Sequence, residues 1–373
     1  MNKEGRVEYS QYFIMTVLFT VGTTILITPG SLATELHQNA WLAPLIAFIP
    51  GLIIVVLYNQ ISKLKPDQSI VEMMRSILGA WLGSFVSILF IVTAFLAAAM
   101  VLYDVSRFIT TVFMPQTPPV FINTLFVLLL VYGLMNGFDT LARMVEILFP
   151  LFIILFILLI FSLLPQIEFK NIQPLFDAPV SKFAYSTLSL TSVVYMPLIF
   201  FLMIQPHELK GSNNSFKPFA AGVFVGSIVN MIIISLNILV VGANVSSIQE
   251  YPAYHLAQKI DIGGFVERVE AVVAIMWLIT AFVKLLVYFY TAFIGITQVL
   301  NLKKKKLFIT PLAFLLIVIS IDIFPDSVYE NQFNSSTWIV WISSVALGSA
   351  TILISVNSIK NVRNKKRKNN VGE

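Results

Sequence analysis

Long apolar runs recur along almost the whole chain and constrain its fold more than any other feature. Each is close to the ~20 residues that a helix needs to cross the hydrocarbon core of a membrane. The ten runs lie at about 9–36, 41–60, 81–112, 119–137, 140–164, 184–205, 217–242, 264–300, 307–324 and 337–359. Because 57% of the residues are apolar and only 12% are charged, the chain has too little polar surface for a soluble domain. No alternating β-barrel pattern occurs, so a helical bundle is predicted.

The basic residues are distributed unevenly between the predicted loops. With the N-terminus in the cytoplasm, 18 of the 24 Lys and Arg residues lie in cytoplasmic segments. Those in outer loops are Lys170, Lys182 and Lys259, and those within runs are Arg107, Arg268 and Lys284. The positive-inside rule predicts this for an even number of helices with both termini inside. The basic tail, 360–373, is predicted to contact anionic lipid rather than nucleic acid, since it lacks interleaved aromatic residues.

The runs also repeat in pattern within a predicted single membrane domain, 1–373. The third and eighth runs are both over-long, and each follows an amphipathic segment, at 69–79 and 251–260. Five helices per repeat is an odd number, so the second repeat, 184–359, crosses the membrane upside down relative to the first, 9–164. This predicts the five-plus-five inverted repeat of leucine-transporter-like secondary transporters, with helices one and six broken near the midplane.

The first predicted break combines a glycine with two hydroxyl residues. Gly22, Thr23 and Thr24 lie about 20 Å into the first run at 1.5 Å per residue. An unwound turn there would direct the N–H groups of a half-helix that restarts near Ile25 toward an anion, such as an amino acid carboxylate. The alternative is that Gly22 only admits a neighbouring helix.

The second predicted break lies in the sixth run, where hydroxyl side chains precede the helix-disrupting Pro197. These side chains are Ser189, Thr191, Ser192 and Tyr195. Four hydroxyls beside a helix-disrupting Pro are consistent with a second break. The alternative is that the Ser and Thr hydroxyls bond back to their own helix.

Lys284 lies near the middle of the eighth run, where a Lys costs roughly 3 kcal/mol unless it has a partner. Either end of the run is roughly 24 to 28 Å away, which is too far for the side chain to reach water. Thr280 lies one turn earlier on the same face. An interior functional role is predicted. The alternative is a tilted helix that places Lys284 beside an interfacial carboxylate.

Charged residues gather near the outer ends of the third and eighth runs. They are Asp104, Arg107, Glu267, Arg268 and Glu270. Their spacing predicts ion pairs that form a collar or gate at the outer mouth, rather than direct ligand contacts.

Several chemistries are excluded by composition. With no Cys and three His, the chain has no disulfide, thiolate metal site or Cys nucleophile, and no cofactor is indicated. No nucleophile, base and orienting partner can be assembled from its motifs, so an enzyme is not predicted. The N-terminal segment lacks a small-residue cleavage site, and the first helix is predicted to be retained.

The segment VGTTILITPGSLA, 21–33, resembles the first-helix motif of the amino acid, polyamine and organocation permease superfamily, in which Gly, a small residue and a second Gly precede an apolar turn and a Pro. Gly22, Thr23 and Pro29 match it; Thr24 replaces the second Gly, and the sixth run has no Gly-x-Glu. With its length and ten runs, the whole chain resembles the B subunit of the germinant receptors of endospore-forming bacteria.

That resemblance implies a subunit of the spore inner membrane that binds a small germinant, usually an amino acid, and acts with an A subunit and a lipoprotein C subunit. It implies a pocket between helices one, three, six and eight. Gly22 to Ile25 would receive the carboxylate, and Ser189 to Tyr195 would face the amino group. Tyr103 would form a wall, although an interfacial position is the alternative. Lys284 would replace the cation that sodium-coupled relatives hold between helices one and eight.

Three functions remain open from the sequence. The leading one is a receptor subunit, followed by a stand-alone proton-coupled amino acid permease. A channel along the polar path through Thr23, Ser189 and Thr280 is the third, and the absence of a ring of charged side chains argues against ion selectivity.

Overall fold

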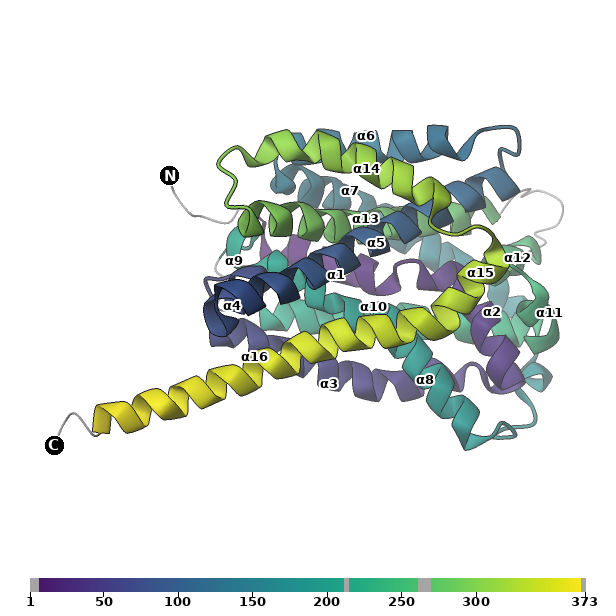
Figure 1. Cartoon of the computed structure of the whole chain (residues 1–373). Helices are drawn as coiled ribbons and strands as arrows, with labels where there is room; N and C mark the ends of the chain where they lie inside the picture. Colours follow the sequence, from purple (N-terminus) through teal and green to yellow (C-terminus); the bar gives the residue numbers. More distant parts are fainter. Residues whose placement is uncertain (1–6, 211–214, 261–269, 370–373) are drawn as a thin grey trace.

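The computed structural model describes residues 7–210, 215–260 and 270–369, with side chains to residue 362. These residues form a bundle of helices (Figure 1). The helices of the first half are α1 (Tyr9–Val21), α2 (Thr24–Leu36), α3 (Leu42–Leu64), α4 (Ile70–Leu78), α5 (Ala80–Val112), α6 (Pro119–Asn136) and α7 (Phe138–Leu163). Those of the second half are α8 (Val180–Val194), α9 (Gln205–Glu208), α10 (Phe216–Leu236), α11 (Ala243–Ile248), α12 (Pro252–Gln258), α13 (Glu270–Val299), α14 (Ile309–Asp322), α15 (Ser327–Gln332) and α16 (Trp338–Asn369).

Within the described ranges, nine helical stretches are long and apolar enough to cross a membrane. They correspond to nine of the ten predicted runs. The remaining run, 307–324, contains α14, whose 14 residues span roughly 21 Å against a hydrocarbon core of roughly 30 Å. The prediction of an all-helical membrane protein is confirmed, with nine to ten helices that are candidates to cross the membrane.

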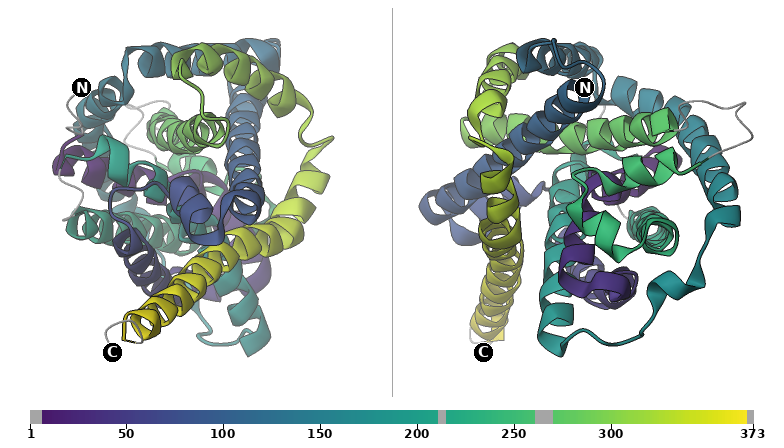
Figure 2. Two further views of the ribbon diagram at one scale, coloured as in Figure 1. Left: turned by 60° about the vertical axis from the view of Figure 1, so that its left-hand side comes forward. Right: turned by 90° about the vertical axis from the view of Figure 1, so that its right-hand side faces the viewer.

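α13 forms the centre of the bundle. In its apolar stretch 83% of the residues are buried, against 22% in the stretch that contains α7. It packs against α1, α5, α7 and α12. α16 lies at the periphery, and its last turns extend beyond the other helices (Figures 1 and 2). Most polar side chains of α13 are therefore enclosed by protein, whereas Ser344, Thr351 and Lys360 of α16 are exposed.

Two of the helical stretches change their backbone geometry partway along. α1 ends at Val21 and α2 begins at Thr24, with Gly22 between them at φ +47° and ψ −138°. α8 ends at Val194 and is followed by a 3₁₀ helix, Met196–Met203, near whose start Pro197 has no N–H to donate. The main chain thus leaves the regular α-helical hydrogen-bond pattern in both stretches.

Small residues let α10 approach α1 closely. A Cβ added at Gly222 would lie 2.7 Å from Thr16 Cβ, and one at Gly226 would lie 2.6 Å from Thr20 Cβ. Thr16 and Thr20 donate their hydroxyls to carbonyls one turn earlier in α1. The GxxxG spacing therefore provides a close-packing face against α1.

The bundle has two distinct ends. We call the one that carries α4 and α9 the α4 end, on the left of Figure 1, and the one that carries α2, α11, α12 and α15 the α15 end, on the right. The right-hand view of Figure 2 faces the α15 end. α4 starts with a capping box, in which Ser69 and Glu72 satisfy each other's backbone N–H groups. Its apolar face packs against α5.

Candidate functional site

Two side chains of α13 contact the junction between α1 and α2. The Thr280 hydroxyl donates to the Gly22 carbonyl oxygen at 2.8 Å. One turn further along α13, the Lys284 Nζ atom lies 3.4 Å from Thr23 Oγ1 and 3.3 Å from the Val193 carbonyl oxygen. Lys284 is only 3% exposed. One buried ammonium group therefore contacts both the α1–α2 junction and the last turn of α8.

Gly22 is required at this junction by its backbone conformation and by close packing. Its φ of +47° lies in a region that residues with a side chain rarely adopt. An added Cβ would also lie 2.7 Å from the Phe19 carbonyl oxygen and 2.8 Å from Lys284 Cδ. Lys284 Nζ lies 5.8 Å from the centre of the Phe19 ring, within the range of a cation–π contact. The glycine thus makes room for the stem of the lysine.

A cavity of about 600 Å³ lies next to this junction. Residues of α2, α5, α8, α13 and α15 line it, together with Ser247 of α11 and residues 249–251 between α11 and α12. Its volume falls within the ~300–1,000 Å³ that is typical of small-molecule sites. The predicted site residues that line it are Thr23, Asp104, Arg107, Ser189 and Lys284. The structure thus brings residues of four separate helical stretches together around one space.

Eight other predicted residues do not line the cavity, namely Gly22, Thr24, Ile25, Tyr103, Thr191, Ser192, Tyr195 and Thr280. Thr24 and Ile25 are each 1% exposed in the first turn of α2. The Thr24 hydroxyl has no hydrogen-bond partner among the described residues. Tyr103 accepts a hydrogen bond from Arg107 Nη1 at 3.0 Å and packs its ring against Phe324.

The hydroxyls at the end of α8 bond mainly to nearby protein groups. Thr191 donates to the Thr187 carbonyl oxygen at 2.6 Å, and Ser192 donates to that of Ser189 at 2.7 Å. The Tyr195 hydroxyl donates to Ser227 of α10 at 2.9 Å. In contrast, Ser186 lines the cavity, is 1% exposed, and its hydroxyl has no partner within the described ranges.

A cluster of charged side chains forms the wall of the cavity nearer the α15 end. Arg107 Nε lies 2.8 Å from Glu250 Oε1, and Arg107 Nη1 lies 3.7 Å from Glu330 Oε2. Asp104 and Glu330 share a hydrogen bond between their carboxyl groups. Tyr251 hydrogen bonds to Glu250, and burial together with the Glu250 charge raises the pKa of the Tyr251 hydroxyl. Three carboxyl groups thus surround one guanidinium.

The predicted collar is described only in part. Asp104 and Arg107 belong to the charged cluster, and Glu270 is the first residue of α13, where it is half-buried. Glu267 and Arg268 lie outside the described residues. The partners of Arg107 therefore come from the segment before α12 and from α15.

Sequence reasoning missed Glu250 and Glu330. Both lie in segments that were read as loops between apolar runs. A local pattern was present for Glu330, since Asp326 accepts a hydrogen bond from the Tyr329 backbone N–H and caps α15. An N-cap residue four positions before an acidic residue predicts a short helix ahead of the last run, and with it an ordered position for Glu330.

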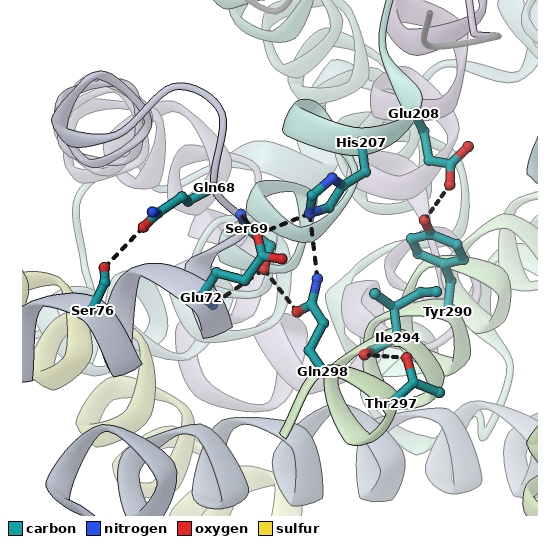
Figure 3. A network of polar contacts seen from close by, with 10 residues as sticks. All are labelled: Gln68, Ser69, Glu72, Ser76, His207, Glu208, Tyr290, Ile294, Thr297 and Gln298. Carbon is teal, nitrogen blue, oxygen red and sulfur yellow. Dashed lines mark hydrogen bonds and ion pairs between the residues drawn. The ribbon is translucent and has the colours of Figure 1, made fainter. Parts of the chain in front are cut away.

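The α4 end is closed by side chains from α4, α9 and α13 (Figure 3). His207 Nε2 lies 3.0 Å from Glu72 Oε2 and 3.3 Å from Gln298 Nε2. Ser69 donates to Gln298 Oε1 at 2.8 Å, and Tyr290 donates to Glu208 at 2.6 Å. Burial raises the pKa of Glu72, but the hydrogen bonds from His207 and Ser69 outweigh it, and the net pKa is below the usual value for Glu.

The fold and the cavity define a transporter-like helical membrane protein. The structure of Mhp1, a nucleobase-cation-symport-1 family transporter in a closed conformation with bromovinylhydantoin bound, matches with a TM-score of 0.64 at 14% identity, over 94% of this chain and 78% of Mhp1. At this identity the likeness concerns the fold alone, which is that of leucine-transporter-like proteins.

Sequence comparison assigns the family. The sequence model of the spore germination protein family matches residues 6–328, and the chain belongs to that family. Spore germination protein KB of Bacillus subtilis (strain 168) is 26% identical over 328 residues, 86% of each chain. Spore germination protein YndE of the same organism is 26% identical over 313 residues, 81% of this chain and 83% of YndE. The resemblance to spore germination permeases is confirmed, and the family is transporter-like rather than enzymatic.

Proposed function

We propose that this chain is the membrane B subunit of a spore germinant receptor and that it binds an amino acid germinant in the cavity. The observation that carries the proposal is the position of the cavity. It lies where the α1–α2 junction meets α5, α8 and α13, with the Lys284 cation on one side and the Asp104–Arg107–Glu330 cluster on the other. A small molecule that carries both charges fits such a site better than an apolar one.

The carboxylate of the germinant would lie near Thr23 and Lys284. Both line the cavity, and the two contacts of Lys284 Nζ, at 3.3 and 3.4 Å, are long. They leave hydrogen-bonding capacity on an ammonium group that has three protons. Ser189 would contribute the α8 wall. The shape of the two junctions would be set by residues 22–25, Thr191, Ser192, Tyr195 and Thr280. Tyr103 would support the cavity wall through its contact with Arg107.

We also propose that the chain has the inverted repeat of transporters, with 9–164 and 184–359 as the two halves. The changes in backbone geometry at Gly22 and after Val194 would be its broken helices. Lys284 would then replace the bound cation of ion-coupled relatives, because its ammonium joins the two interruptions.

The α4 end would face the spore core, with the chain in the spore inner membrane. Basic residues near this end support the orientation, since Lys63 lies in the last turn of α3, Arg75 lies in the last turn of α4, and Lys360 donates to the Ile77 carbonyl. The basic tail would contact anionic lipid. The partners would be an A subunit and a lipoprotein C subunit, which would respond when ligand binding shifts the chain between two conformations.

The test is thermal unfolding of the purified chain with each of the twenty amino acids, beside Lys284→Met and the matched variant Lys182→Met, whose side chain is half exposed and pairs with Glu35. One or a few amino acids should stabilise the wild type and Lys182→Met but not Lys284→Met. Stabilisation of all three proteins alike would contradict a site at Lys284. If no amino acid stabilised the wild type, the proposal of an amino acid germinant would be wrong for the chain by itself.

The runner-up is a proton-coupled amino acid permease. The hydrogen bond between the carboxyl groups of Asp104 and Glu330 favours it, because two carboxyl groups share such a bond only when one of them carries a proton. Uptake of the binding amino acid into vesicles that contain only this chain, driven by a pH gradient, would support the permease. Binding without uptake would support the receptor subunit.

A further inference from the structure

The carboxyl pair formed by Asp104 and Glu330 contains a proton that the proposed function does not use. Glu330 is 8% exposed and Asp104 is half-buried, and both line the cavity. A hydrogen bond between two carboxyl groups needs a proton on one of them. Two ionised carboxylates in contact would repel each other. The pair therefore holds a proton next to the space that a ligand would enter.

Arg107 and Lys284 both act on the pair, and each also contacts other groups. The titratable and charged groups around it are Tyr103 and Arg107 of α5, Lys284 of α13, and Glu250 and Tyr251 before α12. Arg107 is bound more closely to Glu250, at 2.8 Å, than to Glu330, at 3.7 Å. Lys284 is hydrogen-bonded to Thr23 and Val193. Neither cation forms a close ion pair with both carboxyl groups, so a further cation would be favoured there once the proton left.

We propose that Asp104 and Glu330 form an ammonium-binding subsite, and that a ligand ammonium group takes the place of the proton they share. The ammonium group stays protonated and donates hydrogen bonds to both carboxylates. The carboxyl O–H bond breaks, and the displaced proton passes to water through the open part of the cavity. The total charge of the subsite with its proton or with the ammonium is the same. This inference rests on the proposed function and specifies it, because it defines the ligand class by an ammonium group.

The subsite also predicts how a zwitterion would be oriented in the cavity. Lys284 lies at the α1–α2 junction, and the carboxyl pair bridges α5 and α15. A zwitterion would place its carboxylate toward Lys284 and its ammonium toward Glu330. Because Glu330 belongs to the short helix α15, occupation of the subsite would add contacts between α15 and α5. Ligand binding would thereby stabilise the closed arrangement of this wall.

The experiment is calorimetric titration at pH 7 in buffers of different ionisation enthalpy, which reports the number of protons released per ligand bound. The probes are the twenty amino acids, ethylammonium chloride and sodium propionate, the last two carrying the charged groups singly. The proteins are the full-length wild type, Glu330→Gln and Glu168→Gln. Glu168→Gln is the matched control, because Glu168 also pairs with a cation, Lys170 at 2.9 Å, but is about half exposed and does not line the cavity. Thermal unfolding without ligand verifies that each variant is folded.

For the wild type and Glu168→Gln we expect ethylammonium, and any amino acid that binds, to release about one proton per molecule. Glu330→Gln should bind them at least about tenfold more weakly, as expected for a lost hydrogen bond to a charged group, and should release no proton. Propionate should release none from any of the three proteins.

The two proposals fail in different ways. An amino acid that binds Glu330→Gln as tightly as the wild type, or binds the wild type without proton release, would overturn the subsite and leave the proposed function intact. Ethylammonium binding with proton release, without any amino acid binding, would support the subsite and contradict the amino acid germinant. If neither ethylammonium nor any amino acid bound the wild type, the subsite would be wrong.

Discussion

The two ends of the bundle differ in how their polar side chains are arranged. At the α15 end, Asp104, Arg107 and Glu330 line a cavity of about 600 Å³. At the α4 end, His207 contacts both Glu72 and Gln298 (Figure 3). The backbone of Val7 bonds to Glu208 and Lys210. Both ends contain charged groups, and at the α15 end these groups face a space in which a small ligand fits.

The two ends differ in what their polar groups bond to. Polar groups that bond to one another exclude water and hold neighbouring helices together, whereas polar groups around a space remain free to bind a solute. The α4 end has the first arrangement and the α15 end has the second. A change of conformation would therefore require the contacts at the α4 end to break. The two ends should differ in how readily water and solutes reach their side chains, and this difference can be measured.

The largest expected difference between the ends is in cysteine labelling. The chain has no Cys, so single-cysteine variants have no background. Ser189→Cys lines the cavity, whereas Thr297→Cys replaces a side chain at the α4 end that is 1% exposed. In detergent, a hydrophilic thiol reagent should modify Ser189→Cys faster by about a thousandfold, since the buried thiol reacts only after local opening. Ser31→Cys, which is exposed at the cavity mouth, is the positive control. Equal rates would remove the distinction between the ends.

The second-largest effect is expected on stability, at the α1–α2 junction between the two ends. Gly22→Ala should lower the free energy of unfolding by about 2–4 kcal/mol, because the added Cβ meets Phe19 and Lys284 and the backbone is strained for a residue with a side chain. Gly348→Ala, in α16 with no heavy atom within 4 Å of the added Cβ, should be neutral or slightly stabilising. Denaturant titration in detergent measures both. A Gly22→Ala protein as stable as Gly348→Ala would contradict the close packing of Lys284 on the junction.

A smaller effect is expected for the cation of the charged cluster. Arg107→Gln should lower the free energy of unfolding by about 1–2 kcal/mol, because Glu250 and Glu330 both lose the guanidinium. Hydrogen exchange of the α15 backbone should become faster in the same variant. Lys182→Gln removes the more exposed contact to Glu35 at 3.9 Å and should change stability by less than about 0.5 kcal/mol. If exchange in α15 did not change, Arg107 would not position Glu330.

The smallest effect is the pH dependence of the contacts at the α4 end. The folded-state pKa of Glu72 is below its unfolded value, so the stability it contributes is complete above the unfolded pKa and is lost as the pH falls through the folded pKa. Both Glu72 and His207 are about one third exposed, which limits this contribution to about 0.5–1 kcal/mol. The stability difference between the wild type and Glu72→Gln should therefore shrink below pH of about 4. A stability difference that grew on acidification would show that folding does not lower the pKa of Glu72.

The sequence predicted the helical class and most of the helix positions. The stretch around Lys284 was assigned to a membrane helix from hydropathy alone, and the structure places this side chain at 3% exposure among Thr23, Phe19 and Val193. α14 shows the limit of the method, because the predicted run 307–324 is apolar enough but its α-helix has 14 residues. Helix ends depend on local capping and on neighbouring loops, which an average over about 20 residues does not resolve.

The partners of the charged residues could not be predicted from the sequence. Asp104 and Arg107 were assigned to a collar with Glu267, Arg268 and Glu270, whereas the described contacts of Arg107 are with Glu250 and Glu330. Glu330 follows Arg107 by more than two hundred residues, and no local periodicity links them. Which carboxylate meets a guanidinium depends on how helices rotate and cross, and one sequence does not specify those angles.

The sequence by itself therefore determined that this chain is a helical membrane protein, that it resembles germination permeases, and that Gly22 and Lys284 are unusual for their positions. It could do so because transfer of apolar residues into lipid and the cost of a buried charge are properties of a short segment. Only the tertiary structure decided that Lys284 meets the α1–α2 junction, that Asp104 meets Glu330, and that all three side chains line one cavity. These contacts join segments far apart in the chain, and their energies depend on distances that arise only when the helices pack.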